Sequence, residues 1–336
     1  MDGVESDIIE LLRHDQLISA QTVKLTQLGG GVSSDVFLVE EVGKRFVVKR
    51  ALPRLKVKDN WEANTSRNRV EYEFLRYLQG ILPDCAPTVF AVGDGYFAME
   101  YLGPEYKNWK ELLLAGDCRV EVAAQAAKLL GTLHRISYGD AELAHRFETT
   151  ANFHQLRTDP YLITTGSRHP ALQKLFAAEA VRLEQTRECL VHGDLSPKNI
   201  LIGNGRLVLL DCEVAWYGDP AFDLAFLINH LLLKSLYHAP LDRGLQSLIE
   251  EFIREYFFQR KLDAGAAHSL ASRTSKLLLM LLLARIDGKS PVEYLRSDCK
   301  CNFVRSFVFD RLPRSGTDLN PLILDWFGCL RTQAWR

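Results

Sequence analysis

The stretch VHGDLSPKNILI, residues 191–202, carries the strongest signal in this chain. It sets Asp194 and Asn199 five residues apart in a polar loop that apolar segments flank. A second acid, Asp211, follows Asp194 by 17 residues at the end of the apolar run LVLL. Phosphoryl transfer needs a carboxylate that orients and deprotonates the attacking hydroxyl, and hard oxygen ligands that hold Mg²⁺ on the triphosphate. Asp194 suits the first role, and Asn199 and Asp211 suit the second.

The pattern H-G-D-x-x-x-x-N, followed by an apolar strand and an aspartate, resembles the aminoglycoside phosphotransferase / choline kinase-like family, which has the protein-kinase-like fold. The continuation DCEVAWYGDPAFDLA, residues 211–225, is similar to the family pattern I-D-W-E-x-x-x-x-G-D-P-x-x-D-L-A. The resemblance runs from about residue 25 to residue 236. It implies an α+β, two-lobed fold, with a small β-rich N-lobe at residues 1–102 and a larger helical C-lobe at residues 103–336.

Several polar residues around the HGD motif have roles that the resemblance implies or leaves open. It implies that Asp223 anchors the backbone of the catalytic loop and that His192 is structural. Lys198 is a candidate for neutralising charge on the γ-phosphate, with an ordinary exposed lysine as the alternative. Ser196 is a candidate for facing the acceptor, and Glu213 is a candidate for reaching the metal or the substrate.

A glycine-rich run, LGGGVSSD at residues 28–35, joins two segments with strand character. Glycines let backbone N–H groups approach phosphate oxygens, and serine hydroxyls can donate as well. We therefore expect Gly30, Gly31, Ser33 and Ser34 to contact the phosphates of a nucleotide. A plain β-turn is the alternative for this run taken alone.

The strand ending FVVK, residues 46–49, follows this run and presents Val47 and Lys49 on one face. The resemblance implies that Lys49 contacts the α- and β-phosphates, and such a lysine needs a carboxylate to hold it. The predicted helix at residues 69–79 offers Glu71 and Glu73, which lie about 200° apart around a helix and cannot both face the lysine. We choose Glu71, because it fits the family pattern E-x-x-x-L-x-x-L.

The run FAMEYLG, residues 97–103, resembles the hinge whose backbone hydrogen-bonds the adenine ring. The groups involved would be main-chain atoms near Glu100 and Leu102. Side chains at such a hinge say little about base choice, so ATP is expected over GTP by default. The cofactors expected from the whole pattern are ATP and Mg²⁺.

Hydrophobic spacing predicts a β-rich first third and a helical remainder. We expect an opening helix near residues 8–12, then two strands within residues 22–39 on either side of the glycine-rich run, and further strands at 45–49, 88–91 and 95–101. We expect long helices at 120–136, 172–186, 222–236, 245–258 and 266–286. Short β-like runs at 189–192, 200–202 and 206–210 predict one small hairpin-like insert among the helices.

The acceptor site is the least determined part of the sequence. The segment NFHQLRTDPYL, residues 152–162, brings Arg157 as a candidate for binding a carboxylate or sugar group, although packing is favoured. Trp216 follows the metal-binding acid and is a candidate for an aromatic wall beside a small polar ligand. The balanced charge mildly favours a sugar, amino alcohol or amino acid over a polycationic aminoglycoside. The spacing E-x-x-x-Y-G-x-x-x-x-D at residues 213–223 also resembles the methylthioribose kinase branch.

The composition narrows the class of protein. The chain has 336 residues, with 41 Lys and Arg against 42 Asp and Glu, so a general nucleic-acid binder is disfavoured. Its seven cysteines are odd in number and irregularly spaced, which predicts free thiols in a reducing compartment. The apolar runs at residues 224–233 and 277–284 are shorter than the roughly 18–20 residues of a membrane span. We expect a soluble, cytoplasmic protein with no membrane partner, and the oligomeric state stays open.

Two rival functions remain. A protein kinase is disfavoured because Cys212 and Glu213 follow Asp211 where Phe-Gly would be expected, and no A-P-E segment precedes the 222–236 helix. A non-catalytic nucleotide-binding scaffold is disfavoured because every polar group expected of the enzyme is present. We predict a Mg-ATP-dependent kinase acting on a hydroxyl of a small metabolite or antibiotic.

Overall fold

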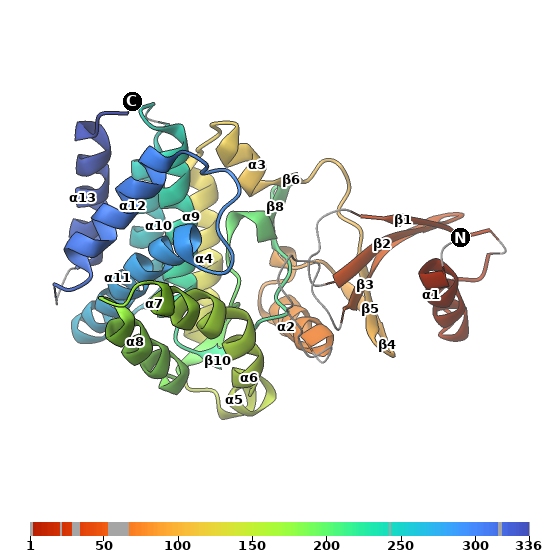
Figure 1. Cartoon of the computed structure of the whole chain (residues 1–336). Coiled ribbons are helices and arrows are strands. Elements are labelled where there is room, and N and C mark those ends of the chain that lie inside the picture. The colour runs from red at the N-terminus through yellow and green to blue at the C-terminus, as the bar shows by residue number, and fades with distance from the viewer. Residues whose placement is uncertain are drawn as a thin grey trace. The chain divides into compact units, whose positions relative to one another are not determined.

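The computed structural model describes residues 3–20, 22–28, 34–52, 67–241, 243–314 and 318–335. The chain divides into two compact units. The first unit comprises Met1–Tyr106 and Val208–Glu213, and the second unit comprises Lys107–Leu207 and Val214–Arg336. Strands dominate the first unit and helices the second (Figure 1), so the predicted α+β class is confirmed.

The first unit is built on an antiparallel five-stranded sheet with the order β1-β2-β3-β5-β4. The strands are β1 (Lys24–Gln27), β2 (Ser34–Glu41), β3 (Lys44–Ala51), β4 (Val89–Gly93) and β5 (Tyr96–Glu100). The turns from β2 to β3 and from β4 to β5 contain Gly43 and Gly95, both with positive φ. Such a backbone conformation favours glycine, which explains the short, tight connections.

Two helices cover the two faces of this sheet. Helix α1 (Gly3–His14) buries Ile8, Ile9 and Leu12 against Phe46 and Val48 of β3 and neighbouring residues on the same face. Because side chains alternate along a strand, Lys49 projects from the opposite face. Helix α2 (Arg67–Ile81) lies on that side and carries Glu71 to Lys49. The alternation therefore places the lysine opposite the α1 core and beside α2.

Helices form most of the second unit, and α9 is its most buried element. They are α3 (Trp109–Leu114), α4 (Val120–Ile136), α5 (Ala141–Arg146), α6 (Thr150–Phe153), the π-helix η2 (His154–Ile163), α7 (Thr164–Arg168), α8 (Gln173–Gln185), α9 (Ala221–His238), α10 (Leu245–Arg260), α11 (Ala264–Asp287), α12 (Asp298–Arg311) and α13 (Leu319–Thr332). Helix α9 contacts α10 and α11 and is buried nearly throughout its length. A helix in such a position needs apolar residues on all sides, as its sequence has.

The five long helices predicted from hydrophobic spacing are confirmed, with ends within two residues of the structure. The short strands differ from the prediction of one hairpin-like insert. Strand β7 (Cys189–Val191) pairs with β10 (Trp216–Gly218), whereas β8 (Ile200–Gly203) pairs with β6 (Lys107–Asn108) and neighbours β9 (Arg206–Leu209). Strand β10 is not predicted from the sequence because three residues are too few to show a period of two.

Trp216, a candidate for the acceptor site, lies on β10 in the interior of the second unit. Its side chain is 0% exposed, and its ring stacks on Phe153 with a centroid distance of 4.2 Å. An indole with no exposed surface offers no contact to a ligand in this structure, so we assign Trp216 to core packing.

No helix of the described residues is both long and apolar enough to cross a membrane.

Replacing Trp216 by alanine tests this assignment. A large buried aromatic removed from a packed core costs about 3–5 kcal/mol of unfolding free energy, because a cavity remains. We expect Trp216→Ala to show this loss in chemical denaturation. The control Phe258→Ala removes an exposed ring and should stay within about 0.5 kcal/mol of the parent. Equal stability of the two variants would contradict the packing role.

Candidate active site

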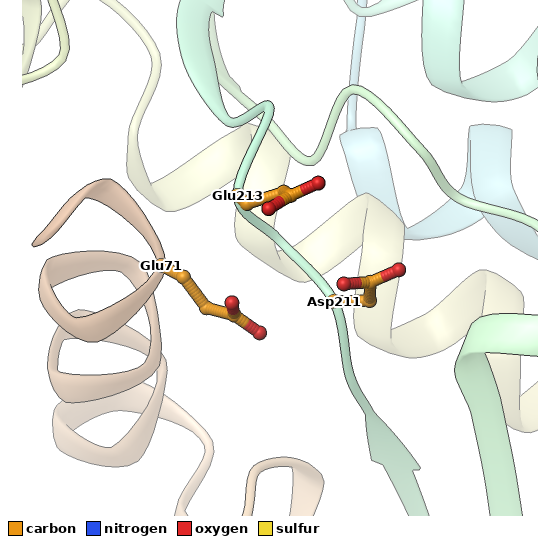
Figure 2. A group of neighbouring side chains, drawn as sticks. All are labelled: Glu71, Asp211 and Glu213. Atoms are coloured by element: carbon orange, nitrogen blue, oxygen red, sulfur yellow. The ribbon is translucent and has the colours of Figure 1, made fainter. Parts of the chain in front are cut away.

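The first unit holds a buried lysine among three carboxylates. The Lys49 Nζ lies 2.7 Å from a carboxylate oxygen of Glu71 and 2.6 Å from one of Asp211. Glu71, Asp211 and Glu213 offer carboxylate oxygens within 4.8 Å of one another. Figure 2 shows Glu71 reaching from α2 toward Asp211, with Glu213 above it on the same strand-end segment as Asp211. The segment Val208–Glu213 thus supplies two of the three acids.

The structure distinguishes Glu71 from Glu73, the two glutamates that compete for the lysine in the sequence. Glu71 is buried and hydrogen-bonded to Lys49, whereas Glu73 lies 3.6 Å from Arg69 one helical turn away on α2. Their separation around the helix turns one glutamate inward and the other toward a neighbouring surface charge. Glu71 is therefore the carboxylate that contacts Lys49 here.

Among the described residues, this cluster sets the cations of Lys49 and Arg67 beside three carboxylates. Burial raises the pKa of Glu71, and the nearby carboxylates of Asp211 and Glu213 raise it further against the opposing effect of Lys49. Burial alone would lower the pKa of Lys49, but Asp211, Glu71 and Glu213 raise it well above its usual value. The three carboxylates therefore outnumber the two described cations beside them. Oxygen donors at this spacing, in such a field, fit a hard divalent cation such as Mg²⁺.

The backbone at Asp211 adds to the case for a functional site. Asp211 has φ of 61°, in the left-handed region that non-glycine residues seldom occupy. Such conformations persist only where the surroundings hold them, and they cluster at functional sites. The ion pair with Lys49 is one contact that holds Asp211 in place.

Arg67 is a residue of this site that the sequence does not reveal. Its Nε donates to Glu213 across 2.9 Å, and a second guanidinium nitrogen donates to the carbonyl of Leu52. The side chain is fully buried. Arg67 precedes the apolar periodicity of α2 at a polar stretch, so nothing in the pattern separates it from a surface arginine.

In the second unit, polar side chains converge on Asp194 in the loop at residues 192–199, called the HGD loop below. Asn199 donates through Nδ2 to the Asp194 carboxylate and to its carbonyl, each at 2.9 Å. Lys198 lies 3.1 Å from one carboxylate oxygen of Asp194, and Arg157 lies 3.0 Å from the other. Asp194 itself is largely buried. The loop thus presents one carboxylate flanked by two cations and an amide.

Arg157 lies buried against the HGD loop, in agreement with the packing alternative that the sequence favoured. It reaches out of η2, donates through Nε to the Gly193 carbonyl across 2.6 Å, and pairs with Asp194. The guanidinium therefore fixes both the backbone and the carboxylate of the HGD loop. The 37 residues that separate Arg157 from Asp194 carry no pattern that would reveal this contact.

Asp223 holds the backbone of the HGD loop from the first turn of α9. Its carboxylate accepts hydrogen bonds from the N–H groups of His192, at 2.8 Å, and Gly193, at 3.0 Å. His134 lies 3.2 Å from the same carboxylate and also contacts Tyr256. Gly193 has φ of 76°, and a Cβ there would lie 2.4 Å from the Val214 carbonyl oxygen, so only glycine fits. This is the contact that the resemblance implies for Asp223.

The remaining candidates lie as follows. Gly30, Gly31 and Ser33 fall outside the described residues, while Ser34 is buried and its hydroxyl has no hydrogen-bond partner among the residues that are described. Ser196 is also buried, and its hydroxyl is likewise unpartnered. The N–H of Glu100 donates to the Thr88 carbonyl within the sheet, so that N–H is already used. Leu102 follows β5 and is half-buried.

Exchanging Asp223 for asparagine tests its hold on the loop. An asparagine has one acceptor oxygen, and its NH₂ would face a backbone donor, so one buried N–H loses its partner at a cost of about 1–3 kcal/mol. We expect Asp223→Asn to lose this much stability in urea denaturation. Asp263→Asn is the matched control, because Asp263 caps α11 at an exposed position where asparagine serves equally well. Equal losses in both variants would argue against the buried anchor.

Comparison with known proteins places these features in a family. The model of the phosphotransferase enzyme family matches residues 24–262. Methylthioribose kinase of Pectobacterium atrosepticum is 26% identical over 262 residues, covering 68% of this chain and 65% of that protein. Methylthioribose kinase of Escherichia coli O45:K1 is 28% identical over 344 residues, covering 91% and 80%. The chain therefore spans less than two thirds of the length of the first of these relatives.

Solved structures share the fold at low sequence identity. A choline kinase from Cryptosporidium parvum has a TM-score of 0.55 and 15% identity, covering 91% of this chain and 94% of that one. The streptomycin-ATP-APH(2")-IIa ternary complex has a TM-score of 0.52 and 20% identity, covering 96% and 99%. The matched region contains Lys49, Glu71, the HGD loop and Asp211. This chain belongs to the phosphotransferase enzyme family.

Proposed function

We propose that the chain is a Mg-ATP-dependent kinase that transfers the γ-phosphate of ATP to a hydroxyl of a small polar acceptor. The observation that carries the proposal is the buried Lys49 held between Glu71 and Asp211. A lysine that a helix glutamate positions beside a metal-binding aspartate is the recurring phosphate grip of kinase-like phosphoryl transfer. The methylthioribose kinase relatives, and the ATP bound in the ternary complex of a structural neighbour, support the same proposal.

The nucleotide end of the site is assigned to the first unit. Lys49 would donate to the phosphates of ATP, with Glu71 holding its ammonium in position. Asp211 and Asn199 would be oxygen ligands of Mg²⁺, and Glu213 is placed to join them, since its carboxylate lies with that of Asp211. Bound Mg²⁺ supplies charge neutralisation on the transferring phosphoryl group. The Ser34 hydroxyl, which is buried without a partner in the described part of the chain, would be a further donor for a phosphate.

The acceptor end is assigned to the HGD loop. Asp194 would accept the hydrogen bond of the acceptor hydroxyl and take its proton. A bond then forms between the acceptor oxygen and the γ-phosphorus, while the bond from that phosphorus to the β–γ bridging oxygen breaks and ADP leaves. Arg157 and Asn199 hold the Asp194 carboxylate in place, so its orientation is set before the acceptor arrives. Lys198 lies beside Asp194 and would neutralise negative charge on the transferring phosphate.

Replacing Asp194 by asparagine should separate chemistry from nucleotide binding. Asparagine keeps the shape but cannot take a proton, so we expect kcat to fall roughly 10²- to 10⁴-fold. The affinity for Mg-ATP should stay within a few-fold of the parent. The measurement is acceptor-stimulated ATP consumption over a panel of sugars, amino alcohols, amino acids and aminoglycosides, with ATP binding by calorimetry. Asp310→Asn, at an exposed position on α12, serves as the control. Unchanged kcat in Asp194→Asn would refute the assigned base.

Removal of the Lys49 charge should act on nucleotide binding instead. Hydrogen bonds to charged groups contribute about 1.5–3 kcal/mol, so Lys49→Met should weaken ATP binding roughly 10- to 150-fold. The control is Lys24→Met, which removes an exposed lysine from β1 in the same sheet. Calorimetric titration of ATP in the presence of Mg²⁺ gives both affinities. The assignment fails if the two variants bind ATP equally well.

A further inference from the structure

A cluster of buried basic side chains lies in the second unit on α9 and α11. It consists of His230, Lys234 and Arg285, whose exposed fractions are 7%, 1% and 9%. His230 and Lys234 are four residues apart, so they share one face of α9. Arg285 comes from the last turn of α11. We call these three residues the basic cluster.

The basic cluster has no acidic partner among the described residues. The Lys234 Nζ has only the His230 carbonyl, at 3.4 Å, and the ring face of Tyr294, at 5.0 Å from its centroid. Arg285 donates through one guanidinium nitrogen to Tyr161 and Ser290, while its buried Nε has no hydrogen-bond partner. The buried hydroxyl of Tyr294 is also unpartnered. The acid nearest in sequence, Glu293, pairs with Lys110.

Such an arrangement is costly in a folded chain. A buried ion without a counter-ion costs several kcal/mol, and two like charges nearby add to that cost. Burial, with the charges of Lys110 and Arg285, lowers the pKa of Lys234 to about 7. Burial and the charges of Arg285 and Lys234 also lower the pKa of His230. Neutral contacts and the more distant charge of Glu293 offset this cost only in part, and no described acid forms an ion pair with the cluster, which is the pattern of a site that awaits an anion.

An aromatic strip connects the basic cluster to the HGD loop. The guanidinium of Arg157, which pairs with Asp194, lies 5.8 Å from the ring centroids of both Tyr161 and Phe226. Phe226 packs in turn against the His230 ring, with 5.1 Å between centroids. Tyr161, the second ring beside Arg157, also contacts Arg285, whose guanidinium carbon lies 5.7 Å from the ring centroid. Arg157 and one aromatic ring therefore link Asp194 to the cluster on each of the two paths.

We infer that the basic cluster binds a compact oxyanion, a carboxylate or phosphate, on the acceptor whose hydroxyl reaches Asp194. The inference rests on the proposed kinase function and narrows its substrate to hydroxy compounds with an anionic group. An arginine fork and a lysine point charge suit the two kinds of oxyanion, and the free Tyr294 hydroxyl adds a neutral donor. Cationic acceptors, including amino alcohols and aminoglycosides, would be repelled by the same charges.

The transfer test uses matched neutral and anionic acceptors with [γ-³²P]ATP and the full chain. Glycerol is compared with glycerate and glycerol 3-phosphate, and ribose with ribonate and ribose 5-phosphate. We expect the anionic member of at least one set to have a kcat/KM at least about tenfold higher than its neutral member. The carboxylate and phosphate arms identify which oxyanion is recognised. Equal or better transfer to the neutral members would overturn the inference and leave the kinase proposal intact.

Replacing Lys234 tests the inference through the preference for anionic acceptors, which would not change if this lysine had only a structural role. Lys234→Met removes a buried unpaired cation and keeps much of its volume, so the ligand-free chain should melt at a higher temperature. The preference for anionic over neutral acceptors should fall toward one. Lys174→Met, an exposed lysine on α8, is the control and should change neither quantity. A lower melting temperature with an unchanged preference would overturn the inference.

Inorganic phosphate tests the basic cluster without any acceptor. The parent chain should be stabilised by phosphate in a thermal melt, and Lys234→Met and Arg285→Met should each lose most of that stabilisation, whereas Lys174→Met should keep it. Equal phosphate stabilisation in the parent and in Lys234→Met, or none in either, would overturn the inference. Absence of both Mg-ATP binding and transfer to every acceptor would instead reject the kinase proposal, whatever phosphate does.

Discussion

The buried carboxylate of Asp223 organises the second unit. It accepts two backbone hydrogen bonds from the HGD loop and faces His134 of α4, which in turn contacts Tyr256 of α10. Three helices are thereby coupled to the backbone that carries Asp194. A loop without regular secondary structure can then hold a reactive side chain in one position, because its peptide groups are fixed from the helical core. Arg157 completes the hold from the other side by binding Gly193 and Asp194.

Charge of opposite sign marks the two ends of the proposed reaction. In the first unit three acids stand beside Lys49 and Arg67, which favours an added cation. In the described part of the second unit no acid forms an ion pair with Lys234 or Arg285, which favours an added anion. Evolution tolerates such costs chiefly where a ligand offsets them. Both clusters thus have the same physical explanation, with Mg-ATP at one and an anionic acceptor at the other.

The sequence predicts the local features of this molecule well and the long-range contacts poorly. The ends of α4 follow directly from apolar spacing, and the HGD motif brings Asp194 and Asn199 together because only five residues separate them. Arg67 escapes prediction, and so do the partners of Arg157, since an arginine that will be buried looks like one on the surface until its distant partner is known. Trp216 shows the converse: its polar handle and its place after Asp211 suggest a ligand, whereas its burial and its packing against Phe153 are visible only in three dimensions.

The central claim is that this chain moves a phosphoryl group from ATP to a small hydroxyl compound. Mass spectrometry of the acceptor after incubation with Mg-ATP and the purified chain, alongside quantitation of ADP, tests it most directly. We expect that one acceptor gains a single phosphoryl group and that one ADP appears for each phosphorylated molecule. Failure of the chain to bind Mg-ATP, with no acceptor modified, would contradict the claim.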